Sequence, residues 1–153
     1  MSTVTASIRL PATPHDVWQT IMDPAVLGEW VTIHRRLVRR DAGPVQVGFT
    51  MDQQLHMRGM NVEVHWELVE CTVDEHAVWK GRGPAHSSAR TEYILHAVDG
   101  TTRFDYRNEF HAPLGALGAI VSRALVGGMP DREATRTLAR LRDYLRADSP
   151  RTS

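Results

Sequence analysis

FDYRNEF, residues 104–110, and the segment HAPLGALGAIVSRALVGGMPDREATRTLARLRDYLRA that follows at 111–147 are the most informative part of this chain. The first stretch alternates residue by residue between apolar or neutral side chains and charged ones, which is the pattern of a strand with one covered face. The second has the three-to-four-residue apolar spacing of a helix. A strand that runs directly into one long terminal helix predicts a curved sheet packed around that helix, with a cavity between them.

The covered face of this strand combines Phe104 and Phe110 with the polar side chains of Tyr106 and Asn108. A close-packed core seldom contains an amide and a phenol unless both find hydrogen-bond partners. A ligand pocket, in contrast, usually has an apolar wall with a few placed polar groups. We therefore expect the cavity to carry the function.

The remainder of the chain predicts further strands and two short helices. Residues 3–10 alternate as a half-buried strand, and Thr13 followed by Pro14 is typical of a helix start, with Asp23-Pro24 as its end. Short connections and the Asp99-Gly100 turn predict an antiparallel meander. The expected segments are helices at 14–22 and 24–31 and strands at 33–39, 45–55, 62–68, from 78, 89–98 and 104–110.

The terminal helix is predicted in two halves. Gly127, Gly128 and Pro130 remove helix propensity and a backbone donor, so the GGMP segment predicts a kink or a break. The apolar positions are Leu114, Leu117, Val121 and Leu125 before it and Ala134, Leu138, Leu141 and Leu145 after it. We expect a single domain over residues 1–147 and a disordered tail at 148–153.

Composition narrows the class of protein. The 18 basic residues balance the 18 acidic residues, so no net field favours nucleic acid, and we expect no nucleic-acid partner. A lone cysteine, Cys71, and an N-terminus without a visible signal peptide predict a cytoplasmic protein. The most apolar window is too short to cross a bilayer and contains Arg123, so no integral membrane association is expected.

Two segments of the amino-acid sequence resemble those of a known protein family. VTASIRLPATPHDVWQTIMDPAVLGEWV, residues 4–31, is similar to the opening of bacterial polyketide cyclase/dehydrase-type proteins of the SRPBCC, START-like or Bet v 1-like, superfamily. The matching features are Pro11-Ala12, Val17-Trp18, Asp23-Pro24 and Glu29-Trp30. DGTTRFDYRNEF and the helix that ends in RTLARLRDYL resemble the closing third of the same proteins.

This resemblance implies an α+β helix-grip fold. An antiparallel curved sheet of about seven strands would wrap around a long C-terminal helix, with two short helices after the first strand. It also implies a hydrophobic cavity for a lipid, polyketide, sterol, quinone or similar molecule. The superfamily contains both catalysts and plain binders, so the resemblance leaves the reaction open.

If the apolar strand faces are concave, they predict the cavity lining. Trp30 and three apolar positions of the terminal helix would complete it. The predicted ligand-binding residues are Trp30, Phe49, Met51, Gln53, Leu55, Trp66, Trp79, Tyr93, Tyr106, Asn108, Phe110, Leu117, Val121 and Leu125.

Binding of a small hydrophobic molecule is the leading hypothesis. Catalysis by a cyclase or aromatase/dehydratase is the alternative, and it needs a group that moves a proton and a donor that polarises a carbonyl. Tyr93 and Tyr106 could supply the donor, and His34 or His86, expected near the cavity mouth, could move the proton. The inward strand positions contain no carboxylate or histidine, which weakens the enzyme hypothesis.

A third hypothesis is an interaction module that delivers lipid or docks on a partner through the apolar segment 114–126. The eight histidines show no metal-ligand spacing, so we expect neither a metal nor an organic cofactor. Exposed edge strands are compatible with a monomer or a homodimer.

Overall fold

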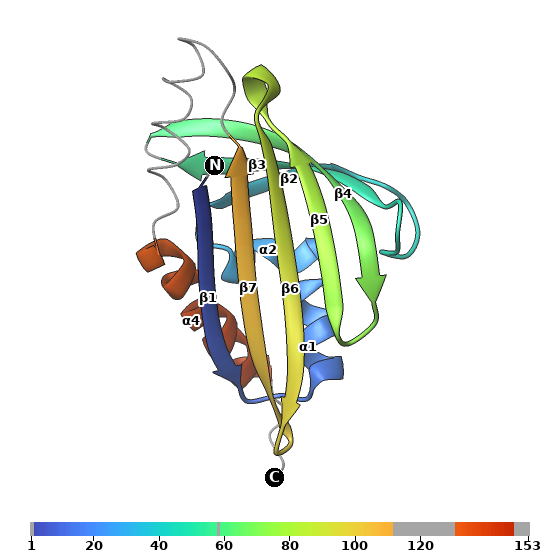
Figure 1. Ribbon diagram of the computed structural model, residues 1–153, viewed down its shortest axis with the longest axis vertical. Coiled ribbons are helices and arrows are strands. Elements are labelled where there is room, and N and C mark those ends of the chain that lie inside the picture. The colour runs from blue at the N-terminus through green and yellow to red at the C-terminus, as the bar shows by residue number, and fades with distance from the viewer. Residues whose placement is uncertain (1, 58, 112–130, 149–153) are drawn as a thin grey trace.

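The computed structural model describes residues 2–57, 59–111 and 131–148 (Figure 1). Within them, seven strands form one antiparallel sheet in the order β1-β7-β6-β5-β4-β3-β2. The sheet curves, and α1, α2 and α4 lie on one side of it (Figure 1). The elements are β1 (Ser2–Leu10), α1 (Pro14–Ile21), η1 (Pro24–Val26), α2 (Leu27–Trp30), β2 (His34–Arg40), β3 (Thr50–Met57), β4 (Met60–Thr72), β5 (His76–Arg82), η2 (Pro84–His86), β6 (Ser88–Val98), β7 (Thr101–His111) and α4 (Asp131–Asp148).

The predicted helix-grip arrangement is confirmed. A seven-stranded antiparallel sheet, short helices after the first strand and a C-terminal helix are all present. Each of β2 to β6 is antiparallel to the next strand along the chain, as short connections require. β1 lies at one edge of the sheet and pairs with β7, with Ala6 opposite Tyr106.

Local sequence signals act where they were expected. The Thr13 hydroxyl accepts a hydrogen bond from the backbone N–H of Asp16 and caps α1, with Pro14 in the first turn. Asp99 and Gly100 both have positive φ values, 49° and 79°, as the two central residues of a tight hairpin turn between β6 and β7 need.

One predicted strand was too long. Residues 45–55 were expected to form a single strand, but β3 begins at Thr50. Gly48 has a φ of +96° and donates its N–H to the Leu68 carbonyl, while Phe49 donates to the Gln46 carbonyl. This turn interrupts the alternation, and it leaves Val47 59% exposed.

α4 joins the core through one apolar stripe. Ala134, Leu138, Leu141 and Leu145 are buried, as their spacing predicted. α4 packs against β1 and α2. The predicted GGMP break and the first half of the terminal helix, with Leu117, Val121 and Leu125, lie outside the described residues.

Hydrogen bonds fix α4 to the linker between α2 and β2. The Thr32 hydroxyl donates to Oε1 of Glu133 at 2.5 Å and also lies 2.9 Å from the Thr137 hydroxyl. The backbone N–H of Thr32 donates to that same Thr137 oxygen at 3.2 Å. Arg140 adds a bond to the Gly28 carbonyl at 3.1 Å. The C-terminal helix is therefore anchored beside the first residues of β2.

Candidate ligand-binding cavity

A cavity of about 80 Å³ lies between the concave face of the sheet and the helices. The three short helical segments after β1 (α1, η1 and α2), the five strands β3 to β7 and α4 contribute to its wall. The lining consists of Ile21, Met22, Pro24, Leu27, Trp30, Val31, Ile33, Met51, Gln53, Leu55, Trp66, Trp79, Thr91, Tyr93, Tyr106, Asn108 and Thr137.

Many of the residues predicted to bind ligand lie together in this lining. They are Trp30, Met51, Gln53, Leu55, Trp66, Trp79, Tyr93, Tyr106 and Asn108. Phe49 and Phe110 are not in it: Phe49 is buried edge-to-face against Trp79 at 6.2 Å, and Phe110 packs half-buried against the core. Phe49 therefore contacts the wall residue Trp79, whereas Phe110 is part of the core packing.

On the helical side of the wall, the sequence predicted Trp30 and three positions of the terminal helix, Leu117, Val121 and Leu125, which lie outside the described residues. Ile21, Met22 and Leu27 face the cavity from α1 and α2, and Thr137 reaches it from α4. The apolar spacing of Val17, Trp18 and Ile21 indicated a buried helix face. That spacing alone does not distinguish a core contact from a cavity contact, because both require the same apolar stripe.

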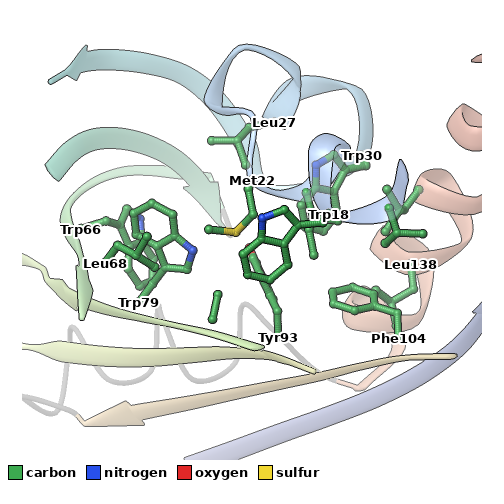
Figure 2. Packing of buried hydrophobic residues seen from close by; sticks show 14 of the residues in the cluster. Trp18, Met22, Leu27, Trp30, Trp66, Leu68, Trp79, Tyr93, Phe104 and Leu138 are labelled. Carbon is green, nitrogen blue, oxygen red and sulfur yellow. The ribbon is translucent and has the colours of Figure 1, made fainter. Parts of the chain in front are cut away.

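Indole rings form much of the apolar wall. Trp66 and Trp79 extend from β4 and β5 and lie close together at one end of the buried cluster (Figure 2). Met22, Leu27 and Trp30 come from the helical side (Figure 2). A β-carbon on Gly81 would lie only 2.8 Å from the Trp66 ring, so the glycine leaves the space that this indole occupies.

Two tyrosines stack on neighbouring strands. Tyr93 and Tyr106 are register partners on β6 and β7, with ring centroids 6.1 Å apart. Tyr93 also contacts Phe104 at 5.5 Å and Trp30 at 6.2 Å, both edge-to-face. Burial raises the pKa of both phenols far above the usual range, and for Tyr106 the neighbouring Thr91 hydroxyl opposes part of the rise. Both hydroxyls are thus neutral donors at physiological pH.

Gln53 links the cavity wall to His34. Its Oε1 accepts a hydrogen bond from the Trp66 indole N–H at 2.9 Å, and its Nε2 lies 2.9 Å from Nδ1 of His34. Because an indole nitrogen can only donate, the amide oxygen must face Trp66 and the amide nitrogen must face His34. His34 Nδ1 is then the acceptor, so the neutral ring carries its proton on Nε2.

Burial also favours the neutral form of the His34 ring. Desolvation lowers the pKa of this imidazole below its ordinary value. The ring also lies against α2, since a β-carbon on Gly28 would be 3.3 Å from Cδ2 of His34. His34 is therefore held as a neutral group that supports Gln53 from outside the lining.

The other predicted histidine is placed differently. His86 is exposed in η2, where Ala85 and His86 both have positive φ values of 56° and 63°. It is not among the residues that line the cavity. Its predicted role in proton transfer thus has no geometric support among the described residues.

Two further polar groups of the wall bind each other. The Thr91 hydroxyl on β6 donates to Oδ1 of Asn108 on β7 at 3.1 Å, and these residues are register partners. Trp30 differs, because its Nε1 is buried without a hydrogen-bond partner in the described part of the chain. It is one of only two such side-chain atoms among the described residues, the other being Nε of Arg142.

The lining contributed by the described residues contains no charged side chain. Across residues 2–57, 59–111 and 131–148, no group of three or more His, Cys, Asp or Glu side chains could hold a metal ion. Within the same ranges, no helix has the length and apolar character needed to span a bilayer. The described part of the site is thus a neutral, largely apolar cavity with a few hydrogen-bonding groups.

Comparison with known proteins agrees with this geometry. Residues 1–146 match the family described as polyketide cyclase / dehydrase and lipid transport. The chain belongs to this family. The predicted membership of the SRPBCC, START-like superfamily is therefore confirmed.

Individual relatives of this polyketide cyclase/dehydrase family member are distant. A Mycobacterium tuberculosis protein named as a toxin is 24% identical over 129 residues, which cover 82% of this chain and 88% of that protein. The solved structure of TTHA0849 from Thermus thermophilus has a TM-score of 0.77 at 16% identity and covers 97% of this chain and 99% of its own. DynU16, from the dynemicin biosynthetic locus, has a TM-score of 0.64 at 14% identity and covers 98% of this chain and 49% of its own. At these identities, the two solved structures show the shared fold alone.

Proposed function

We propose that this family member binds a small hydrophobic molecule, such as a lipid, a polyketide or a quinone-like compound, in the cavity between sheet and helices. The observation that carries the proposal is the composition of the wall: three indoles, two tyrosines and several aliphatic side chains surround a space that also exposes a few polar groups. A largely apolar enclosure with a few convergent polar groups is the usual form of a small-molecule site.

The size of the cavity limits its occupant. Its volume of about 80 Å³ is small beside the roughly 300–1,000 Å³ of pockets for drug-sized ligands. A larger ligand needs wall side chains to move, and the unbranched thioethers of Met22 and Met51 can do so at low cost. We therefore expect a compact ring system to enter most easily.

Native mass spectrometry of the protein purified without added ligand tests this proposal. We expect a bound organic adduct, which solvent extraction would then identify. Leu55→Phe, which places a ring in the cavity wall, should reduce the bound fraction. Val73→Phe, at a position 63% exposed, is the matched control and should leave it unchanged. Equal adduct on all three proteins would contradict binding in the cavity.

Polyketide cyclase or aromatase/dehydratase chemistry is the alternative within the same cavity. Membership of the family described as polyketide cyclase / dehydrase and lipid transport favours it. Tyr106 and Tyr93 would polarise a substrate carbonyl through their neutral hydroxyls. His34 would contribute to this scheme only through its bond to Gln53, because it lies outside the described lining.

Incubation with a linear poly-β-ketone thioester distinguishes the alternative from plain binding. A cyclase forms a ring carbon–carbon bond and releases water, which mass spectrometry detects as the loss of one water from the substrate. We expect Tyr106→Phe to lower turnover while affinity is retained. Turnover equal to buffer, or unchanged in the Tyr93→Phe, Tyr106→Phe and His86→Ala variants, would exclude these roles.

A cytoplasmic location and a monomeric or homodimeric state complete the proposal. Cys71 is a free, partly buried thiol, and burial raises its pKa, so it is poorly reactive. Such a thiol is compatible with a reducing compartment. Analytical ultracentrifugation tests the oligomeric state, and a tetramer or larger assembly would contradict the proposal.

A further inference from the structure

The buried indole N–H of Trp30 lacks a hydrogen-bond partner in the described part of the structure. Trp30 is only 1% exposed, and its Nε1 has no hydrogen-bond acceptor among the described residues. Nearly all buried polar groups in folded proteins are paired, so an exception needs an explanation. Trp30 is also one of the residues that line the cavity, so its unpaired donor belongs to the wall against which a ligand would lie.

The other polar groups of the described wall include several hydrogen-bond donors. Oε1 of Gln53 already accepts from the Trp66 indole, and Oδ1 of Asn108 accepts from the Thr91 hydroxyl. Their amide nitrogens can only donate. The hydroxyls of Tyr93 and Tyr106 are neutral, and each can donate or accept. Together with the Trp30 indole N–H, these groups can donate to a carbonyl oxygen.

The absence of charged side chains from the described lining also limits which ligands the cavity can bind. The described lining has no Lys, Arg or His that could compensate a buried anion. A carboxylate or phosphate moved into such an apolar space would lose its hydration without a counter-charge. A neutral carbonyl oxygen has a much smaller desolvation cost and accepts hydrogen bonds well.

We infer that the cavity selects an uncharged carbonyl compound, such as a cyclic ketone or quinone, and that the Trp30 indole N–H binds its oxygen. This inference rests on the proposed function and narrows it. Within the proposed ligand classes, it favours ketones and quinones and excludes free fatty acids and phospholipids.

Three probes of one ring skeleton test the inference: indane, 1-indanone and indane-1-carboxylate. Their dissociation constants would be measured by isothermal titration calorimetry at pH 7. Because indane is the more hydrophobic molecule, the informative quantity is the ratio of the 1-indanone constant to the indane constant in each variant. Indane-1-carboxylate should bind the natural protein at least about tenfold more weakly than 1-indanone.

Two changes at position 30 remove the N–H. Trp30→Phe shortens the ring, whereas β-(3-benzothienyl)alanine at position 30 keeps the shape of tryptophan and replaces N–H by sulfur. Loss of one hydrogen bond should raise the ketone-to-hydrocarbon ratio about tenfold in both proteins. Trp18→Phe is the control, because Trp18 is buried but does not line the cavity. Its ratio should equal that of the natural protein.

The outcomes separate this inference from the proposed function. Binding of indane with the same ratio in both position-30 proteins would overturn the role of Trp30 while leaving hydrophobic binding intact. Carboxylate binding as tight as ketone binding would overturn the selectivity for uncharged compounds. Absence of binding by all three probes would overturn the proposed function together with the inference.

Discussion

The indole N–H of Trp66 donates to Oε1 of Gln53 over 2.9 Å, between two side chains that are both almost fully buried. The two residues lie on β4 and β3, where Gln53 is the register partner of Val64 and Trp66 is two positions further along. This bond fixes the orientation of the Gln53 amide. It thereby determines which nitrogen of His34 carries a proton.

Gln53→Leu should lower the free energy of unfolding by about 1 to 3 kcal/mol. The substitution leaves the buried Trp66 N–H without its acceptor and His34 Nδ1 without its donor. Urea denaturation monitored by circular dichroism measures the loss. Gln54→Leu, on the neighbouring residue, is the matched control and should change stability by less than about 0.5 kcal/mol. Equal effects of the two substitutions would show that the Gln53 bonds contribute no net stability.

The contribution of His34 to stability should depend on pH. Burial lowers its pKa in the folded protein, so the unfolded chain binds the proton more readily. The free energy of unfolding is therefore expected to fall as the pH drops below about 6.5, the ordinary histidine value, and to level off below the folded pKa. Above about 6.5 His34 contributes no pH dependence.

The variant His34→Asn isolates this effect, because the remaining histidines are common to both proteins. Urea denaturation at a series of pH values from 8 to 5 would give the difference between natural protein and variant. A difference that stays constant across this range would contradict the lowered pKa. Nitrogen-15 chemical shifts of the imidazole would report the Nε2–H tautomer directly.

Gly81→Ala should disturb the cavity wall. The new β-carbon would lie 2.8 Å from Cε3 and Cζ3 of Trp66 and 2.8 Å from Cγ1 of Val64, closer than packing allows. We expect a loss of about 1 to 3 kcal/mol in stability and a shift in tryptophan fluorescence. Lys80→Ala, on the exposed neighbour, should be nearly neutral.

A second substitution identifies the cause of that loss. Trp66→Leu removes the ring carbons that the alanine would meet, so the double variant should be less destabilised than the sum of the two single ones. Additive effects would indicate that the alanine acts elsewhere, for example on strand propensity.

Thr32→Val should loosen α4. The substitution removes the hydroxyl that bonds to Glu133 and Thr137 while keeping the shape of the side chain. We expect a loss of about 1 to 3 kcal/mol, since one of these bonds involves a carboxylate. The substitution should increase the rate of amide hydrogen exchange more in α4 than in β6 and β7. A uniform increase across the sheet would mean that α4 opens only together with the whole domain.

Much of the fold followed from short-range patterns. The alternation through Phe104, Tyr106 and Asn108 placed these side chains on the covered face of β7, and the Thr13 cap and the Asp99-Gly100 turn set element ends. Each of these signals depends on a few neighbouring residues, so a single sequence carries them. The strand expected at 45–55 was partly wrong. Apolar residues keep their alternate spacing through the turn at Gly48, so the sequence pattern does not reveal that turn.

The residues of the cavity were harder to predict from the sequence than the fold was. Strand alternation indicated Met51, Gln53 and Trp66, whose faces are fixed by the sheet. The contribution of Met22 and Leu27 depends on how α1 and α2 pack over that sheet, which no local pattern encodes. The lack of a hydrogen-bond partner for the Trp30 N–H among the described residues likewise depends on tertiary packing, because it involves every residue around the ring.

The pairing of β1 with β7 joins residues about one hundred positions apart, such as Ser7 and Asp105. During synthesis, β1 must therefore wait until β7, at Thr101–His111, has been made before it finds its neighbour. α4, which packs on β1, is made later still. Non-local pairing of this kind slows folding, because the long intervening loop must be ordered first. The enclosure consequently closes only after α4 has been made, and a nascent chain has no complete binding cavity before this helix docks.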